Sequence, residues 1–205
     1  LIEENQFDTI YHEHFSYFSL FTVLNIFSSH DLEIFDVEEI PTHGGSLRLY
    51  IKHKKNNIFS ITDNVKIVLD KEKEAKLDDI NTYKLFSNKV YLSKQKLNNF
   101  FKLCKKSNKK IIGYGAPAKG NTLLNFCKID SIMLPFTVDK SLQKQGLYLP
   151  GTHIPIKSPE EIKKSKPDYL LILPWNLQNE IMDQMHFIRD WGGKFVIPIP
   201  EVKII

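Results

Sequence analysis

Four side chains that handle protons or hydrogen bonds stand next to one another near the start of the chain: Tyr11, His12, Glu13 and His14. An imidazole is the side chain best matched to general-base work at neutral pH. A neighbouring carboxylate and phenol could orient that base or stabilise an oxyanion. In an extended segment His12 and His14 share one face and Tyr11 and Glu13 the other, whereas a turn would let all four converge. The row therefore favours proton-transfer chemistry.

Two other interpretations of this row stay open. Zinc binding is the obvious rival for the letters "HEH", but the helical H-E-x-x-H spacing is absent and no third ligand is nearby. We therefore expect no metal site here. The aromatic residues of "FDTIYHEHFSYFS", residues 7–19, could instead form a patch in which the histidines only satisfy packing and hydrogen bonding.

The segment "PTHGGSLR" contains a second group of polar candidates, with His43, Ser46 and Arg48 around a Gly-Gly pair. Glycine lets the backbone approach a ligand closely, and it equally suits the turn of a simple hairpin. The sequence leaves both interpretations open.

A glycine-rich segment, "GYGAPAKGNT" at residues 113–122, stands where a strand is expected to turn into a helix. Backbone N–H groups at such a turn, together with the helix N-terminus, can form an anion site. The spacing matches neither G-x-G-x-x-G nor the P-loop motif. We predict a phosphate or pyrophosphate cradle, although the glycines could serve only the backbone angles of a tight turn. Its candidate residues are Gly115, Lys119, Gly120, Asn121 and Thr122.

Two further segments are expected at the same edge of a parallel sheet. Asp139 ends a predicted strand, where dinucleotide-binding folds keep an acidic residue for a ribose, although an ordinary strand-end aspartate is equally consistent. Trp175 and Asn176 follow the apolar run "LILP" and offer a ring and an amide to a ligand. Simple core packing of the tryptophan is the alternative.

The first half of the chain has a mixed pattern. An aromatic-rich helical pattern at residues 17–29 precedes two strand-like runs, "LEIFDVEEI" and "GSLRLYIKH". From residue 56 to residue 110 the chain is polar and rich in lysine, with apolar positions at helical spacing. This spacing predicts two amphipathic helices that bridge two domains.

The last section alternates between strand and helix patterns. Strands are expected at "IIGYG", "LPFTVD", "DYLLILP" and "KFVIPIP", and helices at residues 116–127, at "SPEEIKKS" and at residues 176–191. A Gly/Pro-rich loop is expected around "GLYLPGTHIPI". This alternation predicts an α/β fold with a Rossmann-like, mainly parallel sheet.

Composition excludes several classes of protein. The 205 residues are 42% hydrophobic and 25% charged, near the average of soluble proteins, and the longest apolar run, "YLLIL", is too short for a membrane span. The net charge of +4 comes from dispersed lysines, which argues against nucleic-acid binding. The two cysteines cannot form a disulfide framework, so we expect a cytoplasmic protein.

Five motifs, taken in order, resemble the sugar-nucleotide C-methyltransferase family. Members of that family use S-adenosylmethionine to methylate carbon 3 of nucleotide-linked 4-keto deoxysugars. The resemblance covers most of the chain. The motifs are "FDTIYHEHFSYFS", "PTHGGSLRLYI", "GYGAPAKGNTLLN", "VDKSLQKQGLYLPGTHIPI" and "LILPWNL".

The resemblance implies a role for particular residues. His14 would be the general base that forms an enolate, with Tyr11 and Glu13 lining the reacting sugar. The rest of the substrate would be held by the cradle at residues 115–122, by Lys144, by Trp175 with Asn176, and by His43 with Ser46.

The resemblance also implies a domain plan. Residues 1–57 would be the C-terminal tail of a methyltransferase domain, residues 58–108 bridging helices, and residues 109–205 a sugar-nucleotide-binding domain. A zinc module and most of the S-adenosylmethionine site would lie upstream, so we expect this chain to be part of a longer protein and inactive by itself. Its partners would be the nucleotide-linked 4-keto sugar and those upstream domains. A non-catalytic nucleotide-sugar-binding module and an NAD-dependent oxidoreductase are the alternatives.

Overall fold

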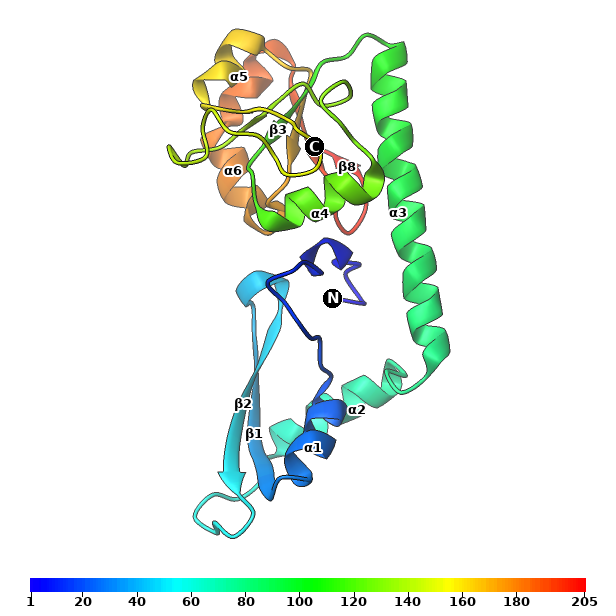
Figure 1. Cartoon of the computed structure of the whole chain (residues 1–205), viewed down its shortest axis with the longest axis vertical. Helices are drawn as coiled ribbons and strands as arrows, with labels where there is room; N and C mark the ends of the chain where they lie inside the picture. Colours follow the sequence, from blue (N-terminus) through cyan, green and yellow to red (C-terminus); the bar gives the residue numbers. More distant parts are fainter. The chain divides into compact units, whose positions relative to one another are not determined.

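The computed structural model describes the backbone of all 205 residues and every side chain except that of His43. The backbone divides into two compact units (Figure 1). Residues Leu1–Glu13 and Asn88–Ile205 form one, which we call the α/β unit, and His14–Ser87 form the other, which we call the hairpin unit. The domain boundaries predicted at residues 57 and 108 are not tested by this division and stay predictions.

The hairpin unit contains the helix and the two strands that the sequence predicts. Helix α1 is Leu20–Ser28, and strands β1, Leu32–Ile40, and β2, Ser46–His53, pair in antiparallel fashion. The turn between the strands contains a short 3-10 helix, η2, Thr42–Gly44. Helix α2 is Asp63–Glu74.

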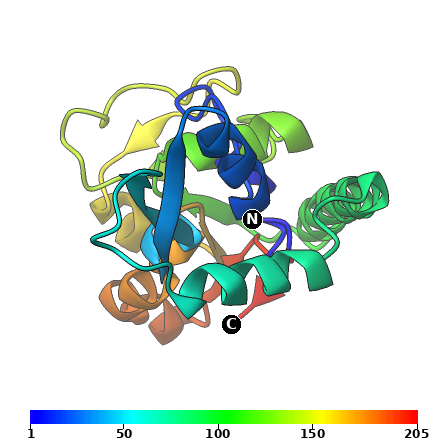
Figure 2. The same ribbon diagram turned by 90° about the horizontal axis from the view of Figure 1, so that it is seen from below.

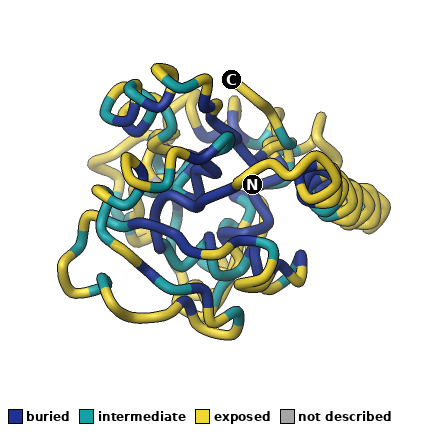
Figure 3. Tube along the Cα trace, turned by 90° about the horizontal axis from the view of Figure 1, so that it is seen from above, coloured by how far each residue is buried: buried dark blue, intermediate teal, exposed yellow. Residues whose placement is uncertain are grey.

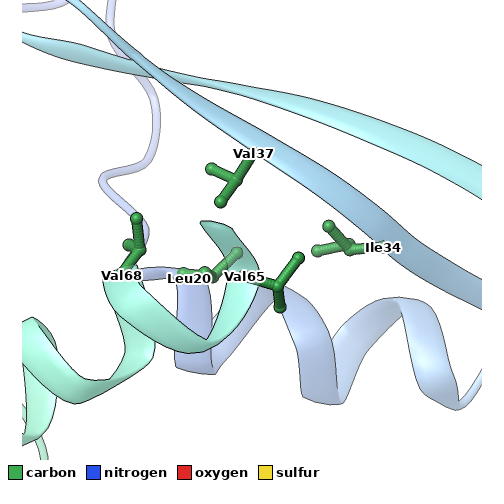
Figure 4. Close-up of a cluster of buried hydrophobic side chains, with 5 residues drawn as sticks. All are labelled: Leu20, Ile34, Val37, Val65 and Val68. Atoms are coloured by element: carbon green, nitrogen blue, oxygen red, sulfur yellow. The ribbon is translucent and has the colours of Figure 1, made fainter. Parts of the chain in front are cut away.

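Helices α1 and α2 pack against β1 (Figures 2 and 4). A second contact fixes the start of α1, where the Glu72 carboxylate accepts the backbone N–H groups of Leu20 and Phe21 at 2.5 and 2.9 Å. A carboxylate is favourable there because the first N–H groups of a helix lack intrahelical partners. The small core of the unit consists of Leu20, Ile34, Val37, Val65 and Val68.

Helix α3, Ile80–Lys106, continues along the chain into the α/β unit and is the second of the two predicted amphipathic helices. The residues that it buries, including Leu97, Phe101 and Cys104, follow helical spacing. Most of its other residues are exposed (Figure 3). None of the described helices combines the length and the apolar character that crossing a membrane requires.

The α/β unit is built on a six-stranded sheet with the order β5-β4-β3-β6-β7-β8, which confirms the predicted α/β class and mainly parallel sheet. All neighbours are parallel except β7 and β8. Within this sheet the chain first forms the central strand β3, then β4 and β5 on one side of it, and then β6 on the other side of β3. The strands are β3, Ile111–Tyr114; β4, Thr137–Val138; β5, Ile156–Lys157; β6, Tyr169–Ile172; β7, Lys194–Ile197; and β8, Lys203–Ile204.

Two of the predicted helices need correction. Helix α4, Ala118–Cys127, begins two residues later than expected, because Pro117 disfavours the helical conformation at Ala116. The helix predicted at residues 176–191 is three short segments: η3, Trp175–Leu177; α6, Gln178–Gln184; and η4, His186–Trp191. The interruption at Met185 coincides with a hydrogen bond from His186 Nδ1 to the Asp183 carbonyl, a group that would otherwise accept a helical bond.

Helix α5, Glu160–Ser165, lies where "SPEEIKKS" predicts it. Strands β5 and β8 were not predicted. Each has two residues, too few for a period-two pattern to be visible in the sequence.

Candidate functional site

The segment that leads to Tyr11 is fixed on the α/β unit. Residues Phe7–Thr9 form a buried 3-10 helix, η1, which contacts α4. The Phe7 ring packs edge-on against the ring of Phe126, with 5.2 Å between centroids. Asn5 Nδ2 donates to Ser93 Oγ at 2.7 Å and to the Pro200 carbonyl at 3.2 Å. The row of proton-handling residues therefore begins at a well-anchored point of the chain.

Asp8 is the most unusual group in this segment, because its carboxyl is completely buried. Its Oδ2 accepts the indole N–H of Trp175 at 2.7 Å, and among the described residues no donor reaches Oδ1. Loss of hydration raises the pKa of Asp8 to about 6, although the Trp175 hydrogen bond and the charge of Lys119 act in the opposite direction. Asp8 can therefore change its protonation state near neutral pH.

Three predicted ligand-binding residues meet beside Asp8. The Lys119 ammonium lies 4.3 Å from the centre of the Trp175 ring and donates to Asn176 Oδ1 at 2.8 Å. Partial burial lowers the pKa of Lys119, whereas the charge of Asp8 raises it. Lys119 comes from α4, which follows β3, and the other two come from η3, which follows β6. Since β3 and β6 are paired and parallel, their carboxyl ends bring these residues together.

Asp8 was not among the predicted site residues. Asp8 and Trp175 are 167 positions apart, and an aspartate in a short polar segment is ordinary. Its position three residues before Tyr11 was the only available signal.

Two positions of the predicted cradle require glycine for steric reasons. Gly115 has φ +90°, and a Cβ there would lie 2.5 Å from Pro174 Cδ. A Cβ at Gly120 would lie 3.1 Å from Leu173 Cβ. The Gly115 N–H already donates to the Val138 carbonyl at 2.6 Å. Both glycines therefore let the turn pack against the end of β6, and the predicted anion site rests on the first turn of α4.

We expect Gly115→Ala to lower the free energy of unfolding of the α/β unit by about 2 kcal/mol, because a strained φ and an overlap with Pro174 add together. Gly146→Ala is the matched control, since Gly146 also has a positive φ of +83° but would place its Cβ in open space. Chemical denaturation followed by tryptophan fluorescence measures both, because both tryptophans lie in the α/β unit. Equal losses in the two variants would contradict the steric explanation.

The remaining cradle residues lie on α4. The Asn121 Oδ1 atom is buried and has no partner among the described residues. Thr122 Oγ1 makes a long bond of 3.4 Å to the Ala118 carbonyl. Both side chains are half-buried.

Asp139 and Lys144 hold the loop after β4 against the turn after β3. The Asp139 carboxylate accepts the backbone N–H groups of Ala116 and Ser141, each at 2.8 Å. Lys144 Nζ donates to the Ala116 carbonyl at 3.0 Å and lies 3.5 Å from Asp139 Oδ2. This arrangement favours the structural interpretation of Asp139, because its carboxylate is already engaged.

The row itself crosses from one unit to the other, with Tyr11, His12 and Glu13 in the α/β unit and His14 in the hairpin unit. Tyr11 is half-buried, and the three residues after it are exposed. The His14 ring contacts Tyr17, with 3.0 Å between its Nδ1 and the phenolic oxygen. This contact gives the imidazole an orienting partner on the same segment.

The second group of polar candidates lies in the hairpin turn. Ser46 begins β2, and its hydroxyl donates to the Thr42 carbonyl at 3.1 Å. The side chain of His43, the other predicted residue, lies outside the described residues.

Fold and site together define an α/β protein with polar side chains gathered beyond the carboxyl ends of two central parallel strands. Residues 41–200 match the family model described as the C-methyltransferase C-terminal domain, so the chain belongs to this family. C-methyltransferase NovU from Streptomyces niveus is 37% identical to it over 205 residues. That alignment covers the whole of this chain and 49% of the relative, so the chain spans about half of the relative's length. The resemblance seen in the sequence motifs is thereby confirmed.

Proposed function

We propose that this chain forms part of an S-adenosylmethionine-dependent enzyme that methylates carbon 3 of a nucleotide-linked 4-keto deoxysugar, with His14 as the general base. Its membership in the C-methyltransferase family supports methyl transfer to carbon. Counted from β3, the strand order is 3-2-1-4-5-6, with the last strand antiparallel; this order is typical of Rossmann-like sheets, which supports a nucleotide-binding role for the α/β unit.

The observation that carries the catalytic proposal is the environment of His14. Its imidazole is exposed, and the Tyr17 hydroxyl lies 3.0 Å from Nδ1. An imidazole that acts as a general base must be able to reach the substrate proton that it removes, and its ring must be held in a fixed orientation. The His14–Tyr17 contact meets the second requirement, and exposure meets the first.

The chemistry follows from the acidity of a carbon next to a ketone. His14 takes the proton from carbon 3, and the electron pair of the broken C–H bond moves toward the carbonyl oxygen to give an enolate. A hydroxyl donor such as Tyr11 would lower the cost of the charge on that oxygen. Glu13, next to the base, would line the sugar and stabilise the imidazolium that forms.

We place most of the S-adenosylmethionine site outside this chain. Asp139, the carboxylate that could meet a ribose, already accepts two backbone N–H groups. When bound elsewhere in the full-length protein, S-adenosylmethionine supplies an electrophilic methyl group to carbon 3. No group of three or more potential metal ligands occurs among the described side chains, and a zinc module upstream of this chain stays a prediction.

We place the diphosphate of the substrate at the start of α4, with Lys119 and Asn176 as its nearest polar groups and Gly120, Asn121 and Thr122 behind them. Lys119 supplies the positive charge. The first turn of α4 supplies N–H groups that point along the helix axis toward an anion. The loop held by Lys144 and the buried indole of Trp175 would define the wall of this site.

We expect Lys119→Met to weaken the binding of dTDP or UDP by about tenfold to a hundredfold, the loss typical of a charge-assisted hydrogen bond. Lys128→Met is the matched control, because Lys128 is exposed at the opposite end of the same helix. Titration calorimetry measures both variants, with NAD as a second ligand. Binding of NAD in place of the nucleoside diphosphates would favour an oxidoreductase and contradict the proposal.

A further inference from the structure

We propose that Asp8 is a positioning residue that couples anion binding at Lys119 to the placement of the Tyr11–Glu13 segment. The inference rests on the proposed function, because it needs Lys119 as an anion-binding group. It adds a connection between the nucleotide end of the substrate and the residues that would line the sugar.

The connection is a continuous series of contacts. Lys119 lies over the face of the Trp175 ring at 4.3 Å, and the same indole donates its N–H to Asp8 Oδ2 at 2.7 Å. Two residues separate Asp8 from Tyr11. The series therefore runs from the proposed diphosphate site through one rigid ring to the backbone just before the row.

The carboxyl of Asp8 is sensitive to Lys119 because it has little other compensation. It is fully buried and accepts one hydrogen bond, while its second oxygen has no donor among the described residues. The Trp175 hydrogen bond favours the ionised carboxylate most, followed by the Lys119 charge and then by the backbone N–H of Asp8 itself; Lys119 is the charged group among the three. A buried carboxylate that loses such a partner is expected to bind a proton.

The other titratable groups near Asp8 leave Lys119 as the cation that matters. Burial raises the pKa of the Cys127 thiol on α4 to about 12, so this group stays neutral. Lys94 on α3 lies over the Phe126 ring at 4.5 Å and contributes to the environment of Cys127, whereas Lys119 is the cation that acts on Asp8. η3 brings the uncharged Trp175 to Asp8.

The coupling has a definite direction. A bound diphosphate partly neutralises Lys119, which makes the Asp8 carboxylate less stable and raises the pKa of Asp8 above its value of about 6. By reciprocity, protonation of Asp8 makes Lys119 a better partner for the anion. Anion binding should therefore strengthen as the pH falls through about 6, because the Asp8 carboxylate is then protonated.

The indole N–H resonance of Trp175 in the ¹H–¹⁵N NMR spectrum of the chain reports the hydrogen bond to Asp8 directly. Its assignment comes from Trp175→Phe, and Trp191 serves as an internal reference. We expect the Trp175 resonance to titrate with a midpoint near the Asp8 pKa of about 6. Asp8→Asn should abolish this titration, and Lys119→Met should raise its midpoint.

Inorganic pyrophosphate is the probe of the coupling. Saturating pyrophosphate should raise the midpoint in the native chain and leave it unchanged in Lys119→Met. Calorimetry at about pH 5 and pH 8 measures how much pyrophosphate affinity each protein loses as the pH rises. This loss should be about threefold to tenfold larger for the native chain than for Asp8→Asn, because a shift of one unit in the pKa of Asp8 corresponds to a tenfold change in affinity. The Asp8→Asn variant corrects for the titration of the ligand itself.

The placement of the row is tested by steady-state kinetics of the full-length protein. Asp8→Ala should lower kcat on the order of tenfold to a hundredfold, the effect of misplacing groups that line a substrate, without raising KM. Asp8→Asn should recover most of the loss, because its amide oxygen can still accept the Trp175 N–H. A loss confined to KM would contradict the positioning role.

The outcomes separate the inference from the proposed function. If pyrophosphate binds with the Lys119 dependence expected above but does not move the Trp175 midpoint, the coupling is wrong and the proposed function stands. If neither pyrophosphate nor a nucleoside diphosphate binds, the anion site and the coupling both fail. A midpoint shift that Lys119→Met removes supports the inference.

Discussion

Replacing His14 by alanine is expected to lower kcat of the full-length protein by about 10²–10⁴-fold, the range attributable to one positioned general base. The substrate Kd should change little, because we propose that the diphosphate binds at α4 in the α/β unit, whereas His14 belongs to the hairpin unit. Methyl transfer to a 4-keto sugar nucleotide, measured with radiolabelled S-adenosylmethionine, gives kcat. Titration calorimetry gives the Kd.

His30→Ala is the control for this prediction. His30 is an exposed histidine of the same unit, at the end of α1 and outside the row. Tyr17→Phe tests the orienting contact and should lower kcat less than His14→Ala, since the ring keeps its basic nitrogen. Full activity of His14→Ala would exclude His14 as the base and leave its neighbours as the candidates.

The buried Asp8 is expected to make the stability of the α/β unit depend on pH. Its pKa is raised from 3.8 to about 6 in the folded protein, so the folded state binds more protons than the unfolded state between these values. The stabilisation from the protonated carboxyl is complete below pH 3.8 and is lost as the pH rises through about 6. The shift corresponds to about 3 kcal/mol of unfolding free energy in total.

Asp8→Asn should remove this component. Urea unfolding monitored by tryptophan fluorescence at several pH values gives the difference between the native chain and the variant, in which the titration of all other groups largely cancels. The difference should change by about 2 kcal/mol between pH 7.5 and pH 4.5, with the native chain gaining relative to the variant at the lower pH. Asp190→Asn, which alters an exposed carboxylate of the same unit, is the control. A flat difference for Asp8→Asn would mean that Asp8 is not strained in its ionised form.

Much of this fold follows from patterns that the sequence displays. The apolar runs that form β3, β6 and β7 are bounded by turn residues, and their alternation with helical patterns predicts the parallel sheet. The two-residue strands β5 and β8 carry no such pattern, because their pairing is set by the strands beside them. The break in the helix at Met185 could not be predicted from the sequence either. Ile181, Met185 and Ile188 are all buried, and their spacing alone is that of a continuous helix.

The candidate site was predictable where a general rule applies. Parallel strands bring their carboxyl ends to one edge, so the meeting of Lys119 with Asn176 could be expected from the order of the elements. Asp8 could not be found in this way. Its burial exists only in the folded chain, and this burial raises the pKa of Asp8 although the hydrogen bond from Trp175, 167 positions away, lowers it.

The central claim is that His14 removes a proton from carbon 3 of the sugar. The most direct measurement follows that proton by NMR, with the full-length protein and the 4-keto sugar nucleotide in D₂O and no methyl donor present. Native protein should exchange the hydrogen on carbon 3 for deuterium faster than a sample without protein, and His14→Ala should reduce the rate to that of the sample without protein. Exchange at the native rate in His14→Ala would contradict the account, because the proton would then be removed by another group.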